Sequence, residues 1–406
     1  MDTGDTAFIL VSAALVMLMT PGLAMFYAGM VRSKNALGTI MQSFIIIAVI
    51  SLEWILWGYS MAFGPDKFGI IGGLEWFGLR GVGSAPSSLY ASTVPHNVFM
   101  IYQCMFAVIT PALITGAFAE RMRFGPFLVF TLLWATFVYN PLAHWIWGNG
   151  GWLGKLGALD FAGGIAVHVS SGVAALAAAI ILGKRQGYGS EELRPHNLPM
   201  TLLGAGILWF GWFGFNAGSA LAAGSIAGSA FVATHVAGTT GALAWIGMEW
   251  KANGKATTLG AASGAIAGLA TVTPASGFVG PISAAIIGLL AGTGCYWAVM
   301  AKNRFGYDDS LDVVGIHGVG GIIGLLAAGF LASKGVNPSG ADGLFFGNPS
   351  QVGIQFLAVI VTIVYAFLVS YILLKIVDKV FGLRVPERDE WDGLDLTQHN
   401  ETAYVL

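Results

Sequence analysis

The sequence is poor in charged side chains and shows no excess of basic ones. Of its 406 residues, 10% are Asp, Glu, Lys or Arg and 56% are hydrophobic. Soluble domains carry about 25% charged residues, so this chain cannot cover a globule of its size with charge, and a soluble protein is excluded. The net charge of −2 at pH 7 also excludes a basic surface for nucleic acid.

Cysteine is almost missing as well. Cys104 and Cys295 both stand in apolar stretches, so we interpret them as small buried hydrophobic residues rather than as a disulfide framework or a metal site. We expect no metal and no cofactor. The first residues, 1–5, lack the basic region of a secretory signal, and we expect the apolar stretch that follows to remain in the mature protein.

Long apolar runs are what the sequence does have. A membrane helix needs about 20 mostly apolar residues, and the alternation typical of a membrane β-barrel is missing. The sequence therefore predicts an all-α integral membrane protein with eleven transmembrane helices. The expected spans are 6–31, 36–63, 89–118, 124–147, 161–183, 198–219, 225–250, 257–274, 278–301, 312–332 and 350–381.

Lys and Arg are unevenly distributed among the loops between these spans. If the N-terminus lies outside, 15 of the 19 Lys and Arg residues fall on the cytoplasmic side. Because cytoplasmic loops of membrane proteins carry an excess of Lys and Arg, we expect a multi-pass protein of the cell inner (cytoplasmic) membrane with its N-terminus outside. Residues 1–382 form the transport domain, and the tail, 383–406, is cytoplasmic.

Two segments of the chain repeat each other. Asp160 stands eight residues before His168, and Asp309 stands eight residues before His317; a glycine follows each histidine four residues later. The segments belong to the fifth and tenth spans. Five spans per unit is an odd number, which predicts an inverted five-plus-five repeat, a common plan in transporters. The units are about 6–183 and 198–332, followed by a long final helix, about 350–381.

The repeat predicts that His168 and His317 meet. Eight helical residues rise about 12 Å, so each histidine lies about 12 Å from its own face of an apolar layer about 30 Å thick. Polar groups at that depth face a cavity or one another, which favours a functional role over simple packing. Asp160 is well placed to cap the fifth span and also to attract a cation, whereas its counterpart Asp309 is more structural.

Aromatic residues near one end of the expected helices suggest a second site. Trp147 closes the fourth span, and Ser219 stands one turn beyond Phe215. An outer Trp beside a hydroxyl could hold a small cation by cation–π attraction and a hydrogen bond. On composition alone, however, packing explains most of the aromatic residues. Glu53, inside the second span, is interpreted as an interhelical hydrogen-bonding residue rather than part of an ion path.

Several motifs along nearly the whole chain resemble those of the ammonium transporter (Amt/Mep/Rh) family. They are Gly211–Ala220, Pro195–Pro199, Ala158–Gly164, Ala119–Arg121, Gly315–Val319 and Gly382–Pro386. The resemblance implies the ammonium transporter fold, with eleven helices in a five-plus-five arrangement, and a homotrimer with one conduction path per subunit. The fold agrees with the independent count of spans.

The resemblance also implies roles for individual residues. Trp147, Phe106 and Ser219 match the outer ammonium-binding site, with Asp160 at the family's essential acidic position; Phe106 and Phe215 match its paired aromatic gate; His168 and His317 match its twin histidines; and Gln103 would line the vestibule. Two positions depart from close relatives: Tyr102, where Phe is frequent, and Glu53, where relatives are often apolar. The tail resembles that of relatives whose cytoplasmic face is blocked by a PII-type signal protein, although its composition also fits a solvated segment.

The expected function is transport of ammonium or ammonia, with methylammonium as an analogue. Ammonium would bind outside and lose a proton, and ammonia would cross an apolar pore past the two histidines, with or without co-conduction of the proton. Potassium has no neutral form and would be rejected. The alternatives are a passive Rhesus-type gas channel for ammonia or CO2, which the Trp147 and Ser219 pair disfavours, and an ammonium sensor. An enzyme is not expected, because neither H-E-x-x-H nor G-x-G-D occurs.

Overall fold

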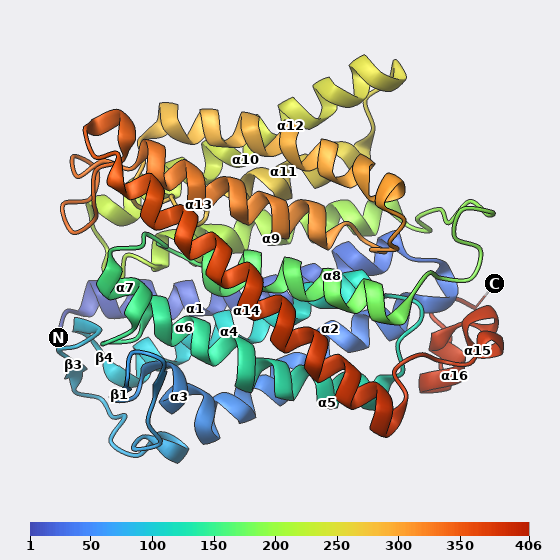
Figure 1. The fold of residues 1–406 in the computed structure, drawn as a ribbon, viewed down its shortest axis with the longest axis horizontal. Coiled ribbons are helices and arrows are strands. Elements are labelled where there is room, and N and C mark those ends of the chain that lie inside the picture. Colours follow the sequence, from blue (N-terminus) through green and yellow to red (C-terminus); the bar gives the residue numbers. More distant parts are fainter. Residues whose placement is uncertain (406) are drawn as a thin grey trace.

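The computed structural model describes residues 1–405, and long helices run between its two ends (Figure 1). The N-terminus lies at one end and the C-terminal tail at the other. The helices are α1 Thr3–Met30, α2 Ala36–Glu53, α3 Tyr59–Phe63, α4 His96–Phe118, α5 Phe124–Trp134, α6 Asn140–Trp147, α7 Trp152–Leu156, α8 Ser170–Leu182, α9 Leu198–Gly218, α10 Ser225–Asn253, α11 Thr258–Val272, α12 Pro281–Phe305, α13 Gly320–Leu331, α14 Ser350–Phe381, α15 Glu387–Asp392 and α16 Leu394–His399.

Two short hairpins stand at the end opposite the tail. Strand β1 (Asp66–Lys67) pairs antiparallel with β2 (Ile71–Gly72), and β3 (Pro86–Ser87) pairs antiparallel with β4 (Ala91–Pro95). The expected third span, 89–118, is therefore wrong at its start. Residues 91–95 are extended and α4 begins at His96, because a residue that precedes a proline is disfavoured in the helical conformation.

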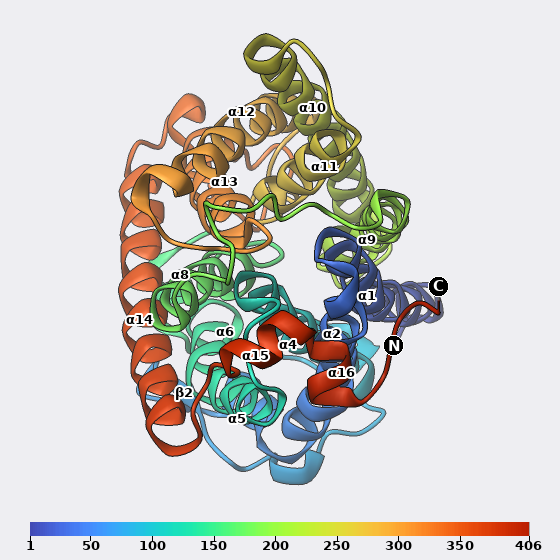
Figure 2. The same cartoon turned by 90° about the vertical axis from the view of Figure 1, so that its right-hand side faces the viewer.

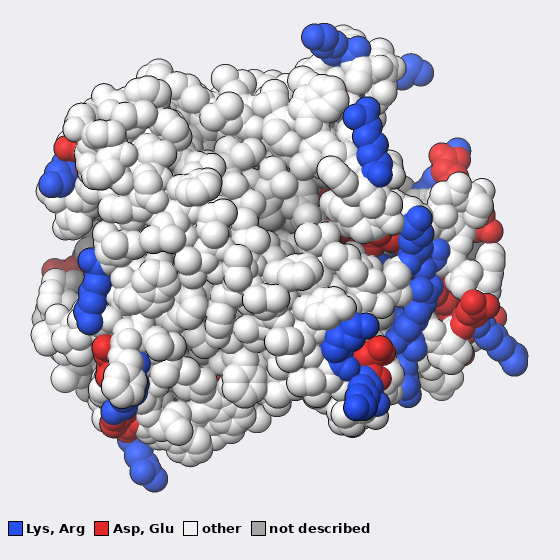
Figure 3. Space-filling view, in the orientation of Figure 1, with Lys and Arg blue, Asp and Glu red and all other residues white. Residues whose placement is uncertain are grey.

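Nine helical segments within residues 1–405 are long and apolar enough to cross a membrane. Helices also occupy the other two expected spans, α10 and α11, but α11 has only 15 residues and α10 falls outside the nine. The all-α membrane fold is confirmed, whereas the count of eleven spans stays a prediction. A broad belt without charged side chains separates the two ends of the molecule in Figure 3, and Lys and Arg gather at the end that carries the tail.

Four spans contain π-helical turns. Residues Trp54–Gly58 (η2) join α2 to α3, and Ala135–Tyr139 (η4) join α5 to α6. The other two, Gly164–Val169 (η5) and Val314–Val319 (η6), open the segments that continue as α8 and α13. Each of these two holds one of the paired histidines. The repeat seen in the sequence thus reappears as the same irregular backbone, of a kind that is frequent at functional sites.

The tail is folded against the helical bundle. Helices α15 and α16 lie across its end, and α16 packs on α2 (Figure 2). Asp395 accepts hydrogen bonds from the backbone N–H groups of Leu37 and Gly38, at 3.0 and 2.8 Å, in the first turn of α2, where negative charge is favourable. The simple solvated segment considered from the sequence is therefore excluded for residues 383–405.

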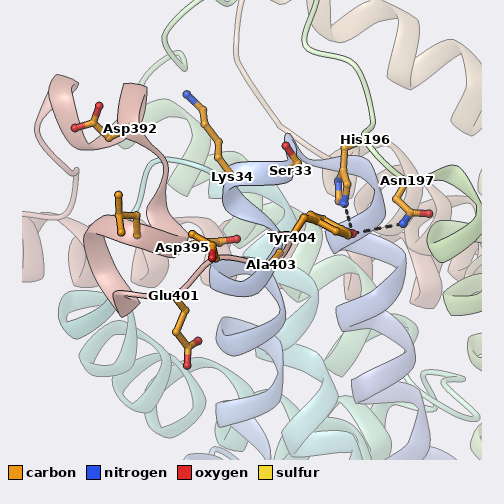
Figure 4. A pocket seen from close by; sticks show the side chains of 11 residues that line it. Ser33, Lys34, His196, Asn197, Asp392, Asp395, Glu401, Ala403 and Tyr404 are labelled. Carbon is orange, nitrogen blue, oxygen red and sulfur yellow. Dashed lines mark hydrogen bonds between the residues drawn. The ribbon is translucent and has the colours of Figure 1, made fainter. Parts of the chain in front are cut away.

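The last described residues of the tail close on a loop of the bundle (Figure 4). The Tyr404 hydroxyl lies 2.9 Å from His196 Nε2 and accepts a hydrogen bond from Asn197 Nδ2 at 3.4 Å. A cavity of about 540 Å³ lies between the tail and this loop. Lys34, at the rim of the cavity, donates a hydrogen bond to the carbonyl of Trp391. The cavity lies at the tail end, and none of the predicted site residues lines it.

Buried ion pairs gather beneath the tail. Glu120 Oε2 lies 3.1 Å from Arg32 Nη2 and 3.3 Å from Arg185 Nη1, and Arg185 Nε lies 2.9 Å from Asp308 Oδ2. Burial by itself would raise the pKa of Glu120, but the charges of Arg185 and Arg32 hold the pKa below its ordinary value. This network joins loops from both halves of the chain.

Candidate conduction site

A cavity of about 90 Å³ opens at the end opposite the tail, and we call it the vestibule. Its lining residues are Phe63, Tyr90, Phe99, Gln103, Phe106, Trp147, Phe161 and Ser219. The Trp147 indole donates a hydrogen bond to the backbone carbonyl of Asp160 at 2.9 Å, and its ring stands edge-on to Phe106 with centroids 6.0 Å apart. The structure therefore brings the predicted Trp147, Phe106 and Ser219 together, with Gln103 beside them.

The Ser219 hydroxyl is held in place by Tyr102. Ser219 Oγ donates to the carbonyl of Phe215 at 2.9 Å, and the Tyr102 hydroxyl is within donating distance both of Ser219 Oγ, at 3.2 Å, and of the same carbonyl, at 2.8 Å. Since the serine proton is engaged, the serine oxygen is left to accept a hydrogen bond from a ligand. The sequence marked Tyr102 only as a departure from relatives, because its partner is a backbone carbonyl.

Two phenylalanine rings close the floor of the vestibule. The centroids of Phe106 and Phe215 are 4.2 Å apart with the planes tilted by 32°, and each residue is 1% exposed. Phe106 lines the vestibule, whereas Phe215 lines the next cavity inward. The predicted gate pair thus stands between the two cavities.

The inner cavity, which we call the lumen, is very small. It has about 10 Å³ of space, and a single water needs about 10–15 Å³ on this measure. Its lining residues are Met19, Leu23, Phe26, Ile109, Leu113, Val167, His168, Leu208, Trp212, Phe215, Ile266 and His317. Apart from the two histidines and the indole of Trp212, every lining side chain is purely apolar. The Trp212 N–H donates to Thr273 Oγ1 at 2.9 Å, so the imidazoles supply the free polar atoms.

His168 and His317 meet as the repeat predicts. Their Nδ1 atoms are 3.2 Å apart, the ring planes differ by 13°, and the residues are 1% and 3% exposed. A hydrogen bond between two Nδ1 atoms requires one ring to donate and the other to accept, so for two neutral rings one Nε2 is an acceptor and the other carries a proton. Within residues 1–405, His168 Nε2 has no hydrogen-bond partner.

Glycines allow the two histidine helices to cross closely. A Cβ on Gly172 would lie 2.2 Å from the backbone nitrogen of Gly318, and a Cβ on Gly321 would lie 3.0 Å from the Cβ of His168. Gly172 and Gly321 are the glycines that follow each histidine four residues later. The repeated His and Gly spacing is therefore what brings two backbones into contact beside the rings.

The Asp160 side chain binds backbone N–H groups and does not line the vestibule. Its carboxylate accepts hydrogen bonds from the N–H groups of Gly163, Gly164 and Ile165, at 2.7, 2.6 and 2.7 Å, so it caps η5 as expected. The structure does not bring it among the residues that line the vestibule. Asp309 caps η6 in the same way, through Val314 N at 2.7 Å. Within the described chain, no group of three or more His, Cys, Asp and Glu residues is placed to hold a metal ion.

Glu53 lies apart from both cavities, between two spans. Its Oε1 accepts a hydrogen bond from Asn140 Nδ2 at 2.8 Å and another from Thr136 Oγ1 at 3.3 Å. These bonds agree with the interhelical interpretation. Its Oε2 is buried and, among residues 1–405, has no partner. The residue does not line the vestibule or the lumen.

Comparison with known protein families gives one consistent result over nearly the whole chain. A family model described as Ammonium Transporter Family matches residues 7–404. The chain is 54% identical to an ammonium transporter of Bacillus subtilis (strain 168), covering 100% of this chain and 99% of the relative. It is 51% identical to the ammonium transporter Amt1 of Archaeoglobus fulgidus, covering 100% of both chains.

Solved structures agree with the sequence matches. Saccharomyces cerevisiae Mep2 superimposes with a TM-score of 0.89 at 40% identity, covering 95% of this chain and 91% of Mep2. A structure described as a sensor Amt protein gives a TM-score of 0.90 at 30% identity, covering 98% of both chains. Fold and sequence therefore point to the same family.

Proposed function

The chain belongs to the ammonium transporter family, and from that premise we propose a route for its substrate: ammonium is captured in the vestibule and ammonia crosses the lumen. The electron-rich faces of Trp147 and Phe106 attract a small cation, and the oxygen of Ser219 accepts one of its hydrogen bonds. Asp160 acts one step removed: its carboxylate caps η5, and its own backbone carbonyl accepts the hydrogen bond of the Trp147 indole. The relatives are named as transporters, and we assign no catalytic role.

Below the capture site, the rings of Phe106 and Phe215 exclude hydrated ions. Moving an unpaired cation through a dry layer costs several kcal/mol or more, whereas neutral ammonia avoids that cost. Ammonium therefore transfers a proton to water in the vestibule, above the gate, and ammonia crosses. Potassium, which cannot become neutral, is rejected by the same barrier.

The observation that carries this proposal is the lumen itself, which holds about one small molecule and offers it two imidazole nitrogens in apolar walls. The acceptor Nε2 of one ring can take a hydrogen bond from ammonia, and the protonated Nε2 of the other can donate to its lone pair. The pair replaces part of the hydration that ammonia gives up.

Single and double alanine variants of His168 and His317 in liposomes test this role. We expect methylammonium flux to fall at least tenfold, or potassium to become permeant, while binding in the vestibule persists. The His235→Ala variant, at an exposed histidine outside the lumen lining, is the control and should transport normally. Unchanged flux in the double variant, with potassium still excluded, would refute the proposal.

We also propose a homotrimer in the cell inner membrane with its N-terminus outside, built from the two five-span units 6–183 and 198–332 and the tail 383–406. The gathering of Lys and Arg at the tail end supports this orientation. A PII-type signal protein would then meet the docked tail. Cross-linking of native membranes, and cysteine labelling from each side at the exposed Phe68 and Val405, test the assembly and the orientation.

A further inference from the structure

The vestibule is much larger than the lumen. It has about 90 Å³ of space, against about 10 Å³ in the lumen, and a single water needs about 10–15 Å³ on this measure. Ammonium is close to water in size, so the capture of one ammonium ion leaves most of the vestibule unfilled. The vestibule therefore has room for a cation larger than the lumen can pass.

Aromatic rings form most of the wall around this space. Among residues 1–405, eight line the vestibule; six of them are aromatic and none of the eight is charged. The aromatic ones are Phe63, Tyr90, Phe99, Phe106, Trp147 and Phe161. Such an uncharged aromatic cage is the environment in which proteins recognise quaternary ammonium ions, because the electron-rich ring faces attract the cation.

One part of the wall is a packed cluster of three rings. Tyr90, between β3 and β4, stacks on Phe99 of α4 with centroids 5.0 Å apart and planes that differ by 8°. Phe63, at the end of α3, stands at 90° and 87° to these two rings, 5.2 Å from each. The Tyr90 hydroxyl donates to the carbonyl of Phe63 at 2.5 Å and accepts the backbone N–H of Asn149 at 3.0 Å. The Tyr90 ring is therefore fixed in place before any ligand arrives.

The other rings come from distant parts of the chain. Trp147, at the end of α6, stands at 84° to Phe106 of α4, and the two rings give the vestibule a corner. Phe161, just before η5, stands at 81° to Phe278 with centroids 5.5 Å apart. Its ring covers Gly277, where a Cβ would lie 2.1 Å from ring carbon Cε2. The glycine makes room for this ring, so the cage is held on both sides by packing.

We propose that the vestibule is an aromatic cage for methyl-substituted ammonium ions, and that a quaternary ion such as tetramethylammonium occupies it without crossing. The inference rests on the proposed function, because it concerns the same capture site. Methyl groups fill the aromatic-walled space that ammonium leaves empty. Each methyl group that is buried adds apolar contact worth up to about fourfold in affinity.

A quaternary ion cannot follow ammonia into the lumen. It has no N–H proton, so it cannot become neutral, and an unpaired cation is excluded from a dry apolar layer. The lumen, at about 10 Å³, is also too small for it. Tetramethylammonium therefore competes with ammonium for the vestibule and blocks transport.

Inhibition of methylammonium uptake into liposomes tests the cage. Tetramethylammonium chloride should raise the KM for methylammonium and leave Vmax unchanged. Potassium chloride at the same concentration is the control, because potassium has the same charge but no methyl groups. We expect the inhibition constant of tetramethylammonium to be at least about tenfold lower than that of potassium. Radiolabelled tetramethylammonium should not enter the liposomes.

Tyr90 provides a matched pair of variants. Y90L keeps an apolar side chain but removes the ring face, and it should raise the inhibition constant of tetramethylammonium at least about fivefold. The increase should exceed any change in the KM for methylammonium, which is bound by Trp147, Phe106 and Ser219. Y90F keeps the ring and should retain the wild-type inhibition constant. Thermal unfolding in detergent checks that both variants are folded.

Three results would overturn the inference: equal inhibition by tetramethylammonium and potassium, uptake of tetramethylammonium itself, or equal inhibition constants for Y90L and the wild type. Titration calorimetry of tetramethylammonium on the purified protein measures binding without transport. Saturable binding that Y90L weakens, together with no saturable methylammonium flux in the wild type, would support the cage and refute the proposed function alone.

Discussion

The two ends of this molecule are stabilised in different ways. The vestibule end is lined by aromatic rings and single hydrogen bonds, and its ligand-facing side chains carry no charge. The tail end holds buried ion pairs among Arg32, Glu120, Arg185 and Asp308. A site that must capture and release a cation needs weak, replaceable contacts, because a carboxylate in the wall would hold the cation too tightly. The strong ion pairs therefore lie at the tail end, where they stabilise the contacts between loops rather than bind a ligand.

Arg121 offers the most direct way to break this contrast. The residue is 0% exposed, and its guanidinium donates to the carbonyls of Gly183, Ala117 and Asp308, at 2.9, 3.0 and 2.6 Å. In R121A these three carbonyls lose their donors at about 1–3 kcal/mol each, and we expect the free energy of unfolding to fall by at least about 3 kcal/mol. Thermal unfolding in detergent should show it as a clear drop in Tm.

The exposed Arg388 provides the matched control for that substitution. Its side chain is 89% exposed, and R388A should leave Tm unchanged. Any folded R121A protein should keep the wild-type KM, because the vestibule is at the other end. An R121A variant as stable as R388A would contradict the view that charge fastens the tail end.

Acidification provides a second way to loosen the tail end. The pKa of Glu120 is held below its ordinary value of 4.5 by Arg185 and Arg32. Its contribution is therefore complete above about pH 4.5 and lost as pH falls through the lowered pKa. We expect Tm to be flat from about pH 8 to 5 and to fall below about pH 4. E120Q should have a lower Tm than the wild type at pH 7, and its Tm should fall less as the pH drops below about 4. If the Tm of both proteins falls equally in acid, Glu120 is excluded as the cause.

A hydroxyl at each end sharpens the comparison. Y102F removes the group that holds Ser219, worth about 1 kcal/mol or about fivefold in binding, so the KM for methylammonium should rise by about that factor with Tm preserved. Y404F makes the same chemical change at the tail end and should leave KM unaltered. Equal KM values for both variants would show that the Tyr102 hydroxyl is not part of capture.

Glu53, which lies between the two ends, should show the smallest effect. In E53Q the amide oxygen still accepts from Asn140 Nδ2, and an N–H group replaces the oxygen that has no partner among residues 1–405. We expect unchanged transport and only a small change in Tm, because the substitution keeps the shape of the side chain and its hydrogen bond with Asn140. A large loss of flux would instead make Glu53 part of a conduction path.

The paired histidines could be predicted from the sequence because their position follows from a repeat. Equal Asp-to-His spacing in two oppositely oriented helices determines depth without any knowledge of side-chain contacts. The Tyr102 tether could not be found this way, because its partner is a backbone carbonyl. The predicted start of α4 is too early because residues 89–95 are apolar enough to extend a span, whereas residues 91–95 form strand β4 and Pro95 disfavours a helical residue before it.

The tail shows the same distinction in another form. Its six acidic residues and two arginines are typical of a solvated segment. Composition does not reveal which acidic side chain will accept hydrogen bonds at a helix N-terminus. Asp395 finds that position on α2 only through the fold. The π-helical turns are likewise invisible to hydropathy, because they insert a residue into the helix without changing its apolar character.

The size of the lumen limits how molecules can pass through it. If ammonia crosses the lumen as proposed, space for about one small molecule means that passage is single-file: two molecules cannot overtake one another, and one leaving the cell blocks one arriving. Water is then a rival occupant rather than a medium, since a water seated between the imidazoles takes the place of the cargo. Throughput is set by how briefly each occupant stays, and a pore that bound ammonia more tightly would be a slower one.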